Sequence, residues 1–251
     1  MDWAKARARA GVTMTVEALA KAVFPGTPPG RDELLNQGFT RNRALTKSAA
    51  PDPRMWPPEL DELPLTGGRF RIDRRLVFTI ANRAASTPDD KWAAAQLHTA
   101  VVVWGAHPGM PMTRAFKPLK NPDAPKRLTE ALRLVRGEGP ISAYRALVKN
   151  PRGRLNIPWL AASYFTKFLY FAGWDSKPFL GQPLIMDDLV IESLVTLTKR
   201  QWKDESADEY LRYMDLAQDI AYEAKTTADV VEWQLWRARE AEFSRADDSG
   251  A

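Results

Sequence analysis

The sequence contains no cysteine and only two histidines. The absence of cysteine excludes disulfides, thiol catalysis, and zinc or iron–sulfur sites with cysteine ligands. His98 and His107 form no cluster with metal-ligand spacing, so we expect neither a metal nor a cofactor, and we assign His98 a structural role. Any chemistry must therefore come from amine, carboxylate or hydroxyl groups.

Long hydrophobic runs are also missing. Residues 1–24 alternate lysine and arginine with alanine and contain no uninterrupted apolar stretch, which is not the pattern of a secretory signal. No segment reaches the roughly 20 consecutive apolar residues that a membrane-spanning helix needs. We therefore expect a cytoplasmic protein that does not bind membranes.

The chain shows no sustained alternation of apolar and polar residues, no strand-rich block and no internal repeat, and this favours an all-α fold. Thr87-Pro88-Asp89-Asp90 is typical of a helix start, with an N-cap, a proline at the first helical position and acids in the first turn. Helices are predicted at residues 12–24, 71–83, about 87–104, 124–136, 141–149, 164–173, 188–202, 209–224 and 228–243.

Eight prolines between Pro25 and Pro64 interrupt forty residues of mixed polarity. This pattern indicates an extended arm over a core, with a flexible linker as the alternative. We therefore divide the chain into an N-terminal helix and arm (residues 1–66) and a helical core (residues 67–251).

Basic and acidic residues are unevenly distributed. The net charge is +5, and residues 113–154 contain eleven lysines and arginines against three acidic residues, whereas residues 204–251 contain five against thirteen. A concentration of basic charge favours a polyanionic partner such as nucleic acid. The alternative is a set of solvated helix faces that share no surface.

The residue pattern most informative about chemistry lies between residues 155 and 190. Lys167 is placed at the start of an apolar helix, Tyr164-Phe165-Thr166-Lys167-Phe168-Leu169-Tyr170-Phe171-Ala172-Gly173, and Ile185-Met186-Asp187 follows about twenty residues later. An amine at a helix start and a carboxylate returned by the next loop are the groups that Schiff-base chemistry at a sugar carbon uses. The alternatives are a solvated Lys167, an Asp187 that only caps the next helix, and Asp188 as the reactive carboxylate.

This stretch resembles the centre of the helix-hairpin-helix DNA glycosylase superfamily, and most closely its 8-oxoguanine glycosylase branch. In that family a hairpin leads into a helix that begins with the catalytic lysine, and a Pro-Val-Asp-like segment follows. The resemblance implies two helical lobes with the active site between them, a hairpin lobe at about residues 113–200, and Lys167 and Asp187 as the catalytic pair.

The hairpin departs from the family, because Leu160-Ala161-Ala162-Ser163 stands where glycines usually let backbone amides approach a DNA phosphate. We expect the hydroxyls of Ser163 and Thr166, with the amides of the helix N-terminus, to bind the phosphate instead. In the last helix, Trp233, Gln234 and Trp236 resemble by position the residues that hold an extruded base in related enzymes. Packing is the alternative role for these tryptophans.

The leading hypothesis is a monomeric DNA glycosylase with lyase activity, acting on DNA that contains a damaged or modified base, with 8-oxoguanine as the first substrate to test. One alternative is a glycosylase that removes modified bases of phage DNA in antiviral defence. Another is a non-catalytic DNA-binding module of the same fold, or a helical scaffold for a protein partner.

Overall fold

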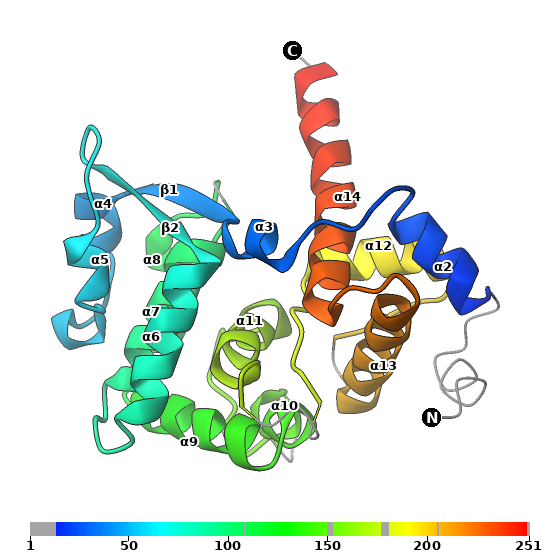
Figure 1. Ribbon diagram of the computed structural model, residues 1–251. Helices are drawn as coiled ribbons and strands as arrows, with labels where there is room; N and C mark the ends of the chain where they lie inside the picture. The colour runs from blue at the N-terminus through cyan, green and yellow to red at the C-terminus, as the bar shows by residue number, and fades with distance from the viewer. Residues whose placement is uncertain (1–13, 108, 150–152, 177–180, 205, 250–251) are drawn as a thin grey trace. The chain divides into compact units, whose positions relative to one another are not determined.

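The structure, a computed structural model, describes residues 14–107, 109–149, 153–176, 181–204 and 206–249, with side chains up to residue 240 (Figure 1). Within these residues the chain is mostly helical with one two-stranded sheet, so the predicted all-α class is confirmed. The chain forms two compact units. We call residues 35–183 the hairpin unit, and residues up to 34 together with those from 184 onward the terminal unit. The division at residue 67 stays a prediction.

The hairpin unit has helix α11 at its centre, packed against α6, α7, α9 and α10. Its elements are β1 (Gly38–Asn42), α4 (Arg43–Ser48), the 3-10 helix η1 (Pro53–Met55), α5 (Glu59–Glu62), β2 (Arg69–Asp73), α6 (Arg74–Ser86), α7 (Ala93–Gly105), α8 (Met112–Ala115), the 3-10 helix η2 (Lys117–Lys120), α9 (Ala124–Gly137), α10 (Pro140–Leu147) and α11 (Ala162–Gly173).

A buried arginine joins three helices of this unit. Arg74, the first residue of α6, is 1% exposed, and its Nε donates a hydrogen bond to Oε1 of Gln37 at 2.7 Å. Its guanidinium carbon lies 5.0 Å from the ring centroid of Trp104 on α7 and 5.2 Å from that of Tyr170 on α11. Cation–π contacts of this kind compensate part of the cost of burying the charge.

The two strands were not predicted. β1 and β2 pair antiparallel, with Phe39 opposite Ile72 and Arg41 opposite Phe70. The buried Phe70 and Ile72 alternate with exposed arginines along β2, but five residues are too few to establish the two-residue period from sequence. The segment predicted as an extended arm therefore contains a strand and short helices.

The start of α7 also differs from its prediction. The Thr87 hydroxyl donates to the carbonyl of Arg83 at 3.0 Å, so Thr87 ends α6 instead of capping α7. Helix α7 begins at Ala93, after a turn in which the amide of Trp92 donates to Oδ1 of Asp90. The Thr-Pro-Asp-Asp signature therefore belongs to the connection between the two helices.

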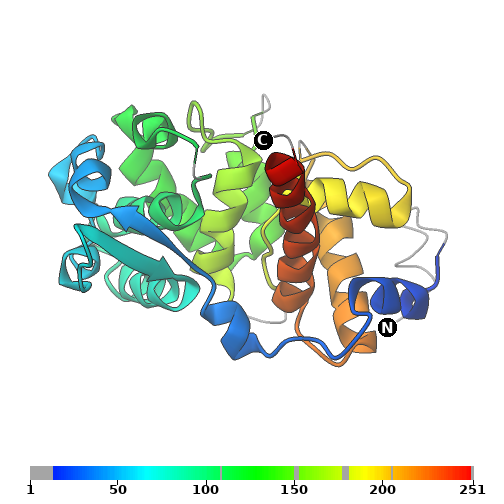
Figure 2. The same ribbon diagram turned by 90° about the horizontal axis from the view of Figure 1, so that it is seen from above.

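The terminal unit packs α14 against both α12 and α13, and α2 against α13; Figure 2 shows α14 (red) beside α12 (yellow) and α13 (orange). Arg31 of α3 joins this unit through an ion pair of 3.2 Å with Asp229, whose side chain is fully buried. The elements are α2 (Val16–Val23), α3 (Arg31–Leu35, which contains the boundary of the units), α12 (Asp188–Thr198), α13 (Ala207–Glu223) and α14 (Ala228–Ser249).

None of the described helices is both long enough and apolar enough to cross a membrane.

Candidate active site

Helix α11 buries almost its whole surface. Its residues from Phe165 to Gly173 are all buried, and aromatic contacts such as Tyr144–Phe165, with 4.9 Å between ring centroids, fill the space around it. A helix that is apolar on all sides is expected at the centre of a domain. Lys167 is the single charged residue in its sequence, so it lies where a charge is costly to bury.

The side chain of Lys167 is 7% exposed. Its Nζ donates to the backbone carbonyl of Ser163 at 3.1 Å and lies 5.7 Å from the ring centroid of Tyr164. Its aliphatic part passes Gly105, the last residue of α7, so closely that a Cβ placed on Gly105 would lie 3.0 Å from Cδ of the lysine. The Ser163 carbonyl thus holds the amine against α11. The close approach of the lysine side chain to residue 105 suits a glycine there, because glycine has no Cβ.

Two details of this helix differ from the sequence-based expectation. Helix α11 begins at Ala162, so Lys167 is its sixth residue and does not open it. Thr166 is fully buried, and its hydroxyl donates to the carbonyl of Ala162 at 2.7 Å. That hydroxyl is thus used within the helix, and the predicted phosphate contact of Thr166 stays a prediction. Ser163, half-buried in the first turn, keeps its predicted phosphate contact as a prediction.

The end of α7 that adjoins Lys167 is fixed by an arginine that the sequence reasoning did not single out. Arg41 on β1 is 9% exposed, and its guanidinium donates to the carbonyls of Val103, Trp104 and Ala106. Burial lowers the pKa of Arg41 from its ordinary value. The final carbonyls of a helix lack intrahelical partners, so this side chain completes the C-terminus of α7 and holds Gly105 in place.

The segment between α10 and α11 is the hairpin of the resemblance, residues 148–161, of which 150–152 lie outside the described residues. The amide of Leu155 donates to the carbonyl of Ala146 at 2.8 Å. A Cβ placed on Gly153 would lie 2.1 Å from the carbonyl oxygen of Val148, so the hairpin closes through a contact that only glycine permits. This hairpin therefore still needs a glycine, outside the stretch of residues 160–163.

Asp187 lies in the terminal unit, at the end of an extended buried segment. The hydroxyl of Tyr210 on α13 donates to the carbonyl of Leu184 at 2.7 Å and accepts from its amide at 3.0 Å. The hydroxyl of Tyr213 donates to the carbonyl of Ile185 at 2.9 Å. These two tyrosines hold the backbone that leads to Asp187. The sequence indicates that they lie on a helix but not that they contact this segment.

Asp187 is the N-cap residue of α12. Its side chain is 8% exposed, and Oδ1 accepts a hydrogen bond from the amide of Val190 at 3.2 Å. The capping role considered as an alternative is therefore real, and it fixes the carboxylate in one orientation. Asp188, the competing candidate, is exposed at the first residue of the helix. Burial thus favours Asp187 as the carboxylate of a site.

The residues proposed to hold a base do not share one environment. Trp233 is buried, its indole Nε1 has no hydrogen-bond partner among the described residues, and the guanidinium carbon of Arg237 lies 4.6 Å from its ring centroid. Gln234 lines a pocket of about 180 Å³ between α2, α12 and α14. Trp236 is half-buried. The base-binding role of these three residues stays a prediction.

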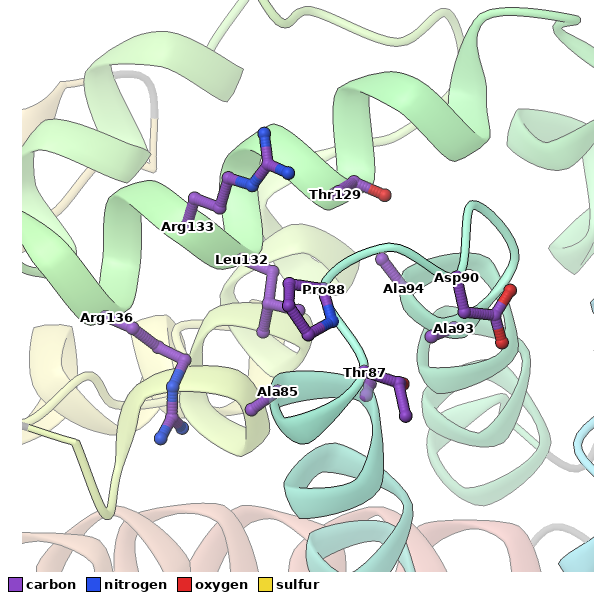
Figure 3. Close-up of a pocket in the computed structure, with 11 residues that line it drawn as sticks. Ala85, Thr87, Pro88, Asp90, Ala93, Ala94, Thr129, Leu132, Arg133 and Arg136 are labelled. Atoms are coloured by element: carbon purple, nitrogen blue, oxygen red, sulfur yellow. The ribbon is translucent and has the colours of Figure 1, made fainter.

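A second pocket lies in the hairpin unit, between the connection of α6 to α7 and helix α9 (Figure 3). It measures about 150 Å³, and Arg133 and Arg136 extend beside it. Nη1 of Arg136 donates to the carbonyl of Ala172 at 3.0 Å, which places this pocket near the C-terminal end of α11. Lys167 is not among its lining residues.

Across the part of the chain that the structure describes, no three acidic or histidine side chains lie close enough together to hold a metal ion.

Residues 32–236 match the family described as "Putative 8-oxoguanine DNA glycosylase OGG-like protein". Comparison with curated proteins and with solved structures gave no match. The matched region contains α11 with Lys167, the hairpin before it and Asp187. Because it covers most of the chain, the protein belongs to the OGG-like family of 8-oxoguanine DNA glycosylase relatives.

Proposed function

We propose that the protein is a bifunctional DNA glycosylase and lyase that removes an oxidised purine, with 8-oxoguanine as the first candidate. Membership of the family supports glycosylase-like activity and DNA as the substrate class. The observation that carries the finer proposal is Lys167, a buried amine on an otherwise apolar helix. An amine buried at the position that the family resemblance assigns to the catalytic lysine is the group that imine chemistry at a sugar carbon needs.

In the proposed reaction the target nucleotide is first extruded from the duplex, because C1′ of its sugar cannot be reached within the stack. The neutral amine of Lys167 attacks C1′, and the bond from C1′ to the base nitrogen breaks. The base leaves with the bonding electrons and takes up a proton. Loss of a proton from nitrogen and opening of the sugar ring at O4′ then give an imine between the lysine and C1′.

The lyase step follows from that imine. Removal of a proton from C2′ expels the 3′ phosphate by β-elimination, and water hydrolyses the imine to release the lysine. We assign Asp187 the stabilisation of the positive charge that develops on the sugar, and a share in proton transfer. Its hydrogen bond with Val190 supports this role, because it keeps the carboxylate oriented without a further ordering cost.

Borohydride trapping tests the proposal. The protein is incubated with duplexes that contain 8-oxoguanine, other modified bases or an abasic site, and reduction converts any imine into a stable adduct. We expect an adduct with the wild-type chain and with Lys21→Gln, an exposed lysine on α2 that serves as the control, and none with Lys167→Gln.

The other outcomes are distinct. Base release without an adduct would mean that water is the nucleophile and that lyase activity is absent. DNA binding with neither release nor adduct would identify a non-catalytic module of the same fold. Trapping on a duplex with another modified base, but not with 8-oxoguanine, would correct the substrate and keep the mechanism.

A further inference from the structure

The hairpin presents a tryptophan to solvent directly before α11. Trp159 is 69% exposed, whereas Ile157 and Leu160 on either side of it are 1% and 5% exposed. A large aromatic side chain gains free energy by leaving water, so a rigidly held one that stays exposed is a candidate for contact with a ligand.

The backbone at this residue is strained. Trp159 has φ of +72°, in the left-handed region that residues with a Cβ rarely adopt. Such a conformation costs free energy, and it persists where the surrounding structure imposes it. The strained backbone orients the indole of Trp159, and this suggests that the side chain has a role.

Hydrogen bonds hold the described hairpin residues around Trp159. The amide of Leu160 donates to the carbonyl of Ile157 at 3.1 Å, which closes a turn around Trp159. Nδ2 of Asn156 donates to the carbonyl of Leu147 on α10 at 3.2 Å, and the guanidinium of Arg127 on α9 donates to the carbonyl of Asn156. The hairpin is thus attached to both α9 and α10 and presents the indole in a defined direction.

A lysine lies over the indole. Nζ of Lys117, on η2, is 3.2 Å from the ring centroid of Trp159, a close cation–π contact. Both side chains are exposed, and Arg114 and Lys120 are exposed on α8 and η2. These elements belong to the stretch of residues 113–154 in which basic residues outnumber acidic ones by eleven to three. The combination of a cation with an aromatic face is the one that single strands and unstacked nucleotides require.

We propose that Trp159 stacks on a nucleobase of the bound DNA and that Lys117 binds an adjacent phosphate when it does so. This rests on the proposed function, since it assumes that the hairpin unit binds DNA. In the family that this chain resembles, hairpin glycines let backbone amides approach a DNA phosphate. Stacking by Trp159 would give this hairpin a contact with a base. Basic charge beside the indole favours a nucleic acid over a protein partner as its ligand.

The test measures affinity for a fluorescently labelled duplex with a stable abasic-site analogue, by anisotropy at several salt concentrations. We expect Trp159→Ala to weaken binding about 5- to 150-fold, the range for loss of one stacked base, with an unchanged salt dependence. Trp159→Phe should recover most of the affinity. Lys117→Ala should weaken binding and reduce the slope of log affinity against log salt by about one.

Two further variants separate stacking from packing. Tyr222→Ala removes an aromatic side chain of the same exposure, 69%, on α13 and should bind as the wild type does. Trp159→Gly removes the Cβ that makes the left-handed backbone unfavourable, so its melting temperature should be equal to or above that of the wild type while its affinity falls as in Trp159→Ala.

Wild-type affinity and salt dependence in Trp159→Ala would overturn this proposal alone, provided that the wild-type chain binds and processes DNA. An equal loss in Tyr222→Ala would overturn it as well, because the effect would then not be specific to the hairpin. If the wild-type chain binds no duplex, modified or abasic, the proposed function fails together with it.

Discussion

Lys167 lies in the middle of a helix whose other residues are uncharged, whereas Asp187 lies just before a helix and caps it. The amine donates a hydrogen bond to the carbonyl of Ser163 one turn away, and its aliphatic part rests against Gly105. The carboxylate accepts from the first turn of α12, in a segment that two tyrosines hold. Lys167 in the hairpin unit is thus a buried amine within a helix, whereas Asp187 in the terminal unit has a carboxylate that caps a helix.

This difference bears on what each residue indicates. An N-cap aspartate contributes about 1 kcal/mol to stability, so the presence of Asp187 is explained without catalysis. A lysine costs more free energy to bury than an apolar residue, and Lys167 stands at the position of the proposed catalytic amine. Asp187 has an observed capping role and a proposed catalytic role, and experiments must separate the two.

The largest effect is expected at Lys167. Lys167→Met keeps the length of the side chain and removes the amine, so base excision should fall by at least about 10³-fold, as on loss of a catalytic nucleophile. Stability in urea should be unchanged or higher, because apolar replacement of a buried charge is often neutral or stabilising. A loss of stability above about 2 kcal/mol would instead give the amine a structural role.

Substitutions at Asp187 separate the cap from the charge. Asp187→Asn should keep the stability of α12, since asparagine caps as well as aspartate, and should reduce excision by about 10²- to 10⁴-fold. Asp187→Ala should lose activity and also about 1 kcal/mol of stability. Asp188→Asn, at the exposed neighbour, is the control. Equal activity of Asp187→Asn and the wild type would leave Asp187 with its capping role only.

His98 is a buried titratable group outside the proposed site, so its titration affects the stability of the fold and not the proposed reaction. His98 on α7 is fully buried, and burial lowers its pKa to about 4, below the unfolded value of about 6.5. The unfolded state therefore binds the proton more readily, and stability falls as the pH drops from about 6.5 towards 4, by about 3 kcal/mol in total.

Denaturant unfolding of the wild type and of His98→Leu at pH 7.5 and 4.5 measures this contribution. The wild type should lose about 2 to 3 kcal/mol more than the variant between the two pH values. Identical losses would assign the acid sensitivity to other groups.

The smallest predicted effect concerns the glycine beside Lys167. In Gly105→Ala the new Cβ would lie 3.0 Å from Cδ and 3.2 Å from Cε of the lysine, so the amine must shift by a few tenths of an ångström. Excision should fall by about 10-fold with little change in stability, because small displacements of a reacting group reduce the rate. Gly137→Ala, at the end of α9, meets nothing within 4 Å and should remain fully active.

Sequence patterns predicted the helices best where periodicity is long. The helix predicted at residues 124–136 matches α9, along which Leu128, Leu132 and Val135 are buried, and the N-terminal ends of α12, α13 and α14 were predicted to within two residues. The start of α11 was also predicted two residues late, at Tyr164 instead of Ala162, because its N-cap residue Ala161 has no side chain that could cap and so gives no sequence signal.

The candidate site was predicted in part. The resemblance pointed to Lys167 and Asp187, and the family match covers both. The groups that hold them, Arg41, Gly105, Tyr210 and Tyr213, act through contacts between residues far apart in the chain, which local patterns do not contain. The left-handed backbone of Trp159 is equally absent from local propensity, since the hairpin imposes it against the preference of the residue.

Residues of the hairpin fall into two kinds. Gly153, through its close contact with the Val148 carbonyl, sets the shape of the hairpin, whereas other residues face outward. A library that randomises residue 153 together with the exposed residues 158 and 161 would test this division. Selection for folded clones should return glycine at residue 153 in every clone and a diversity of side chains at residues 158 and 161.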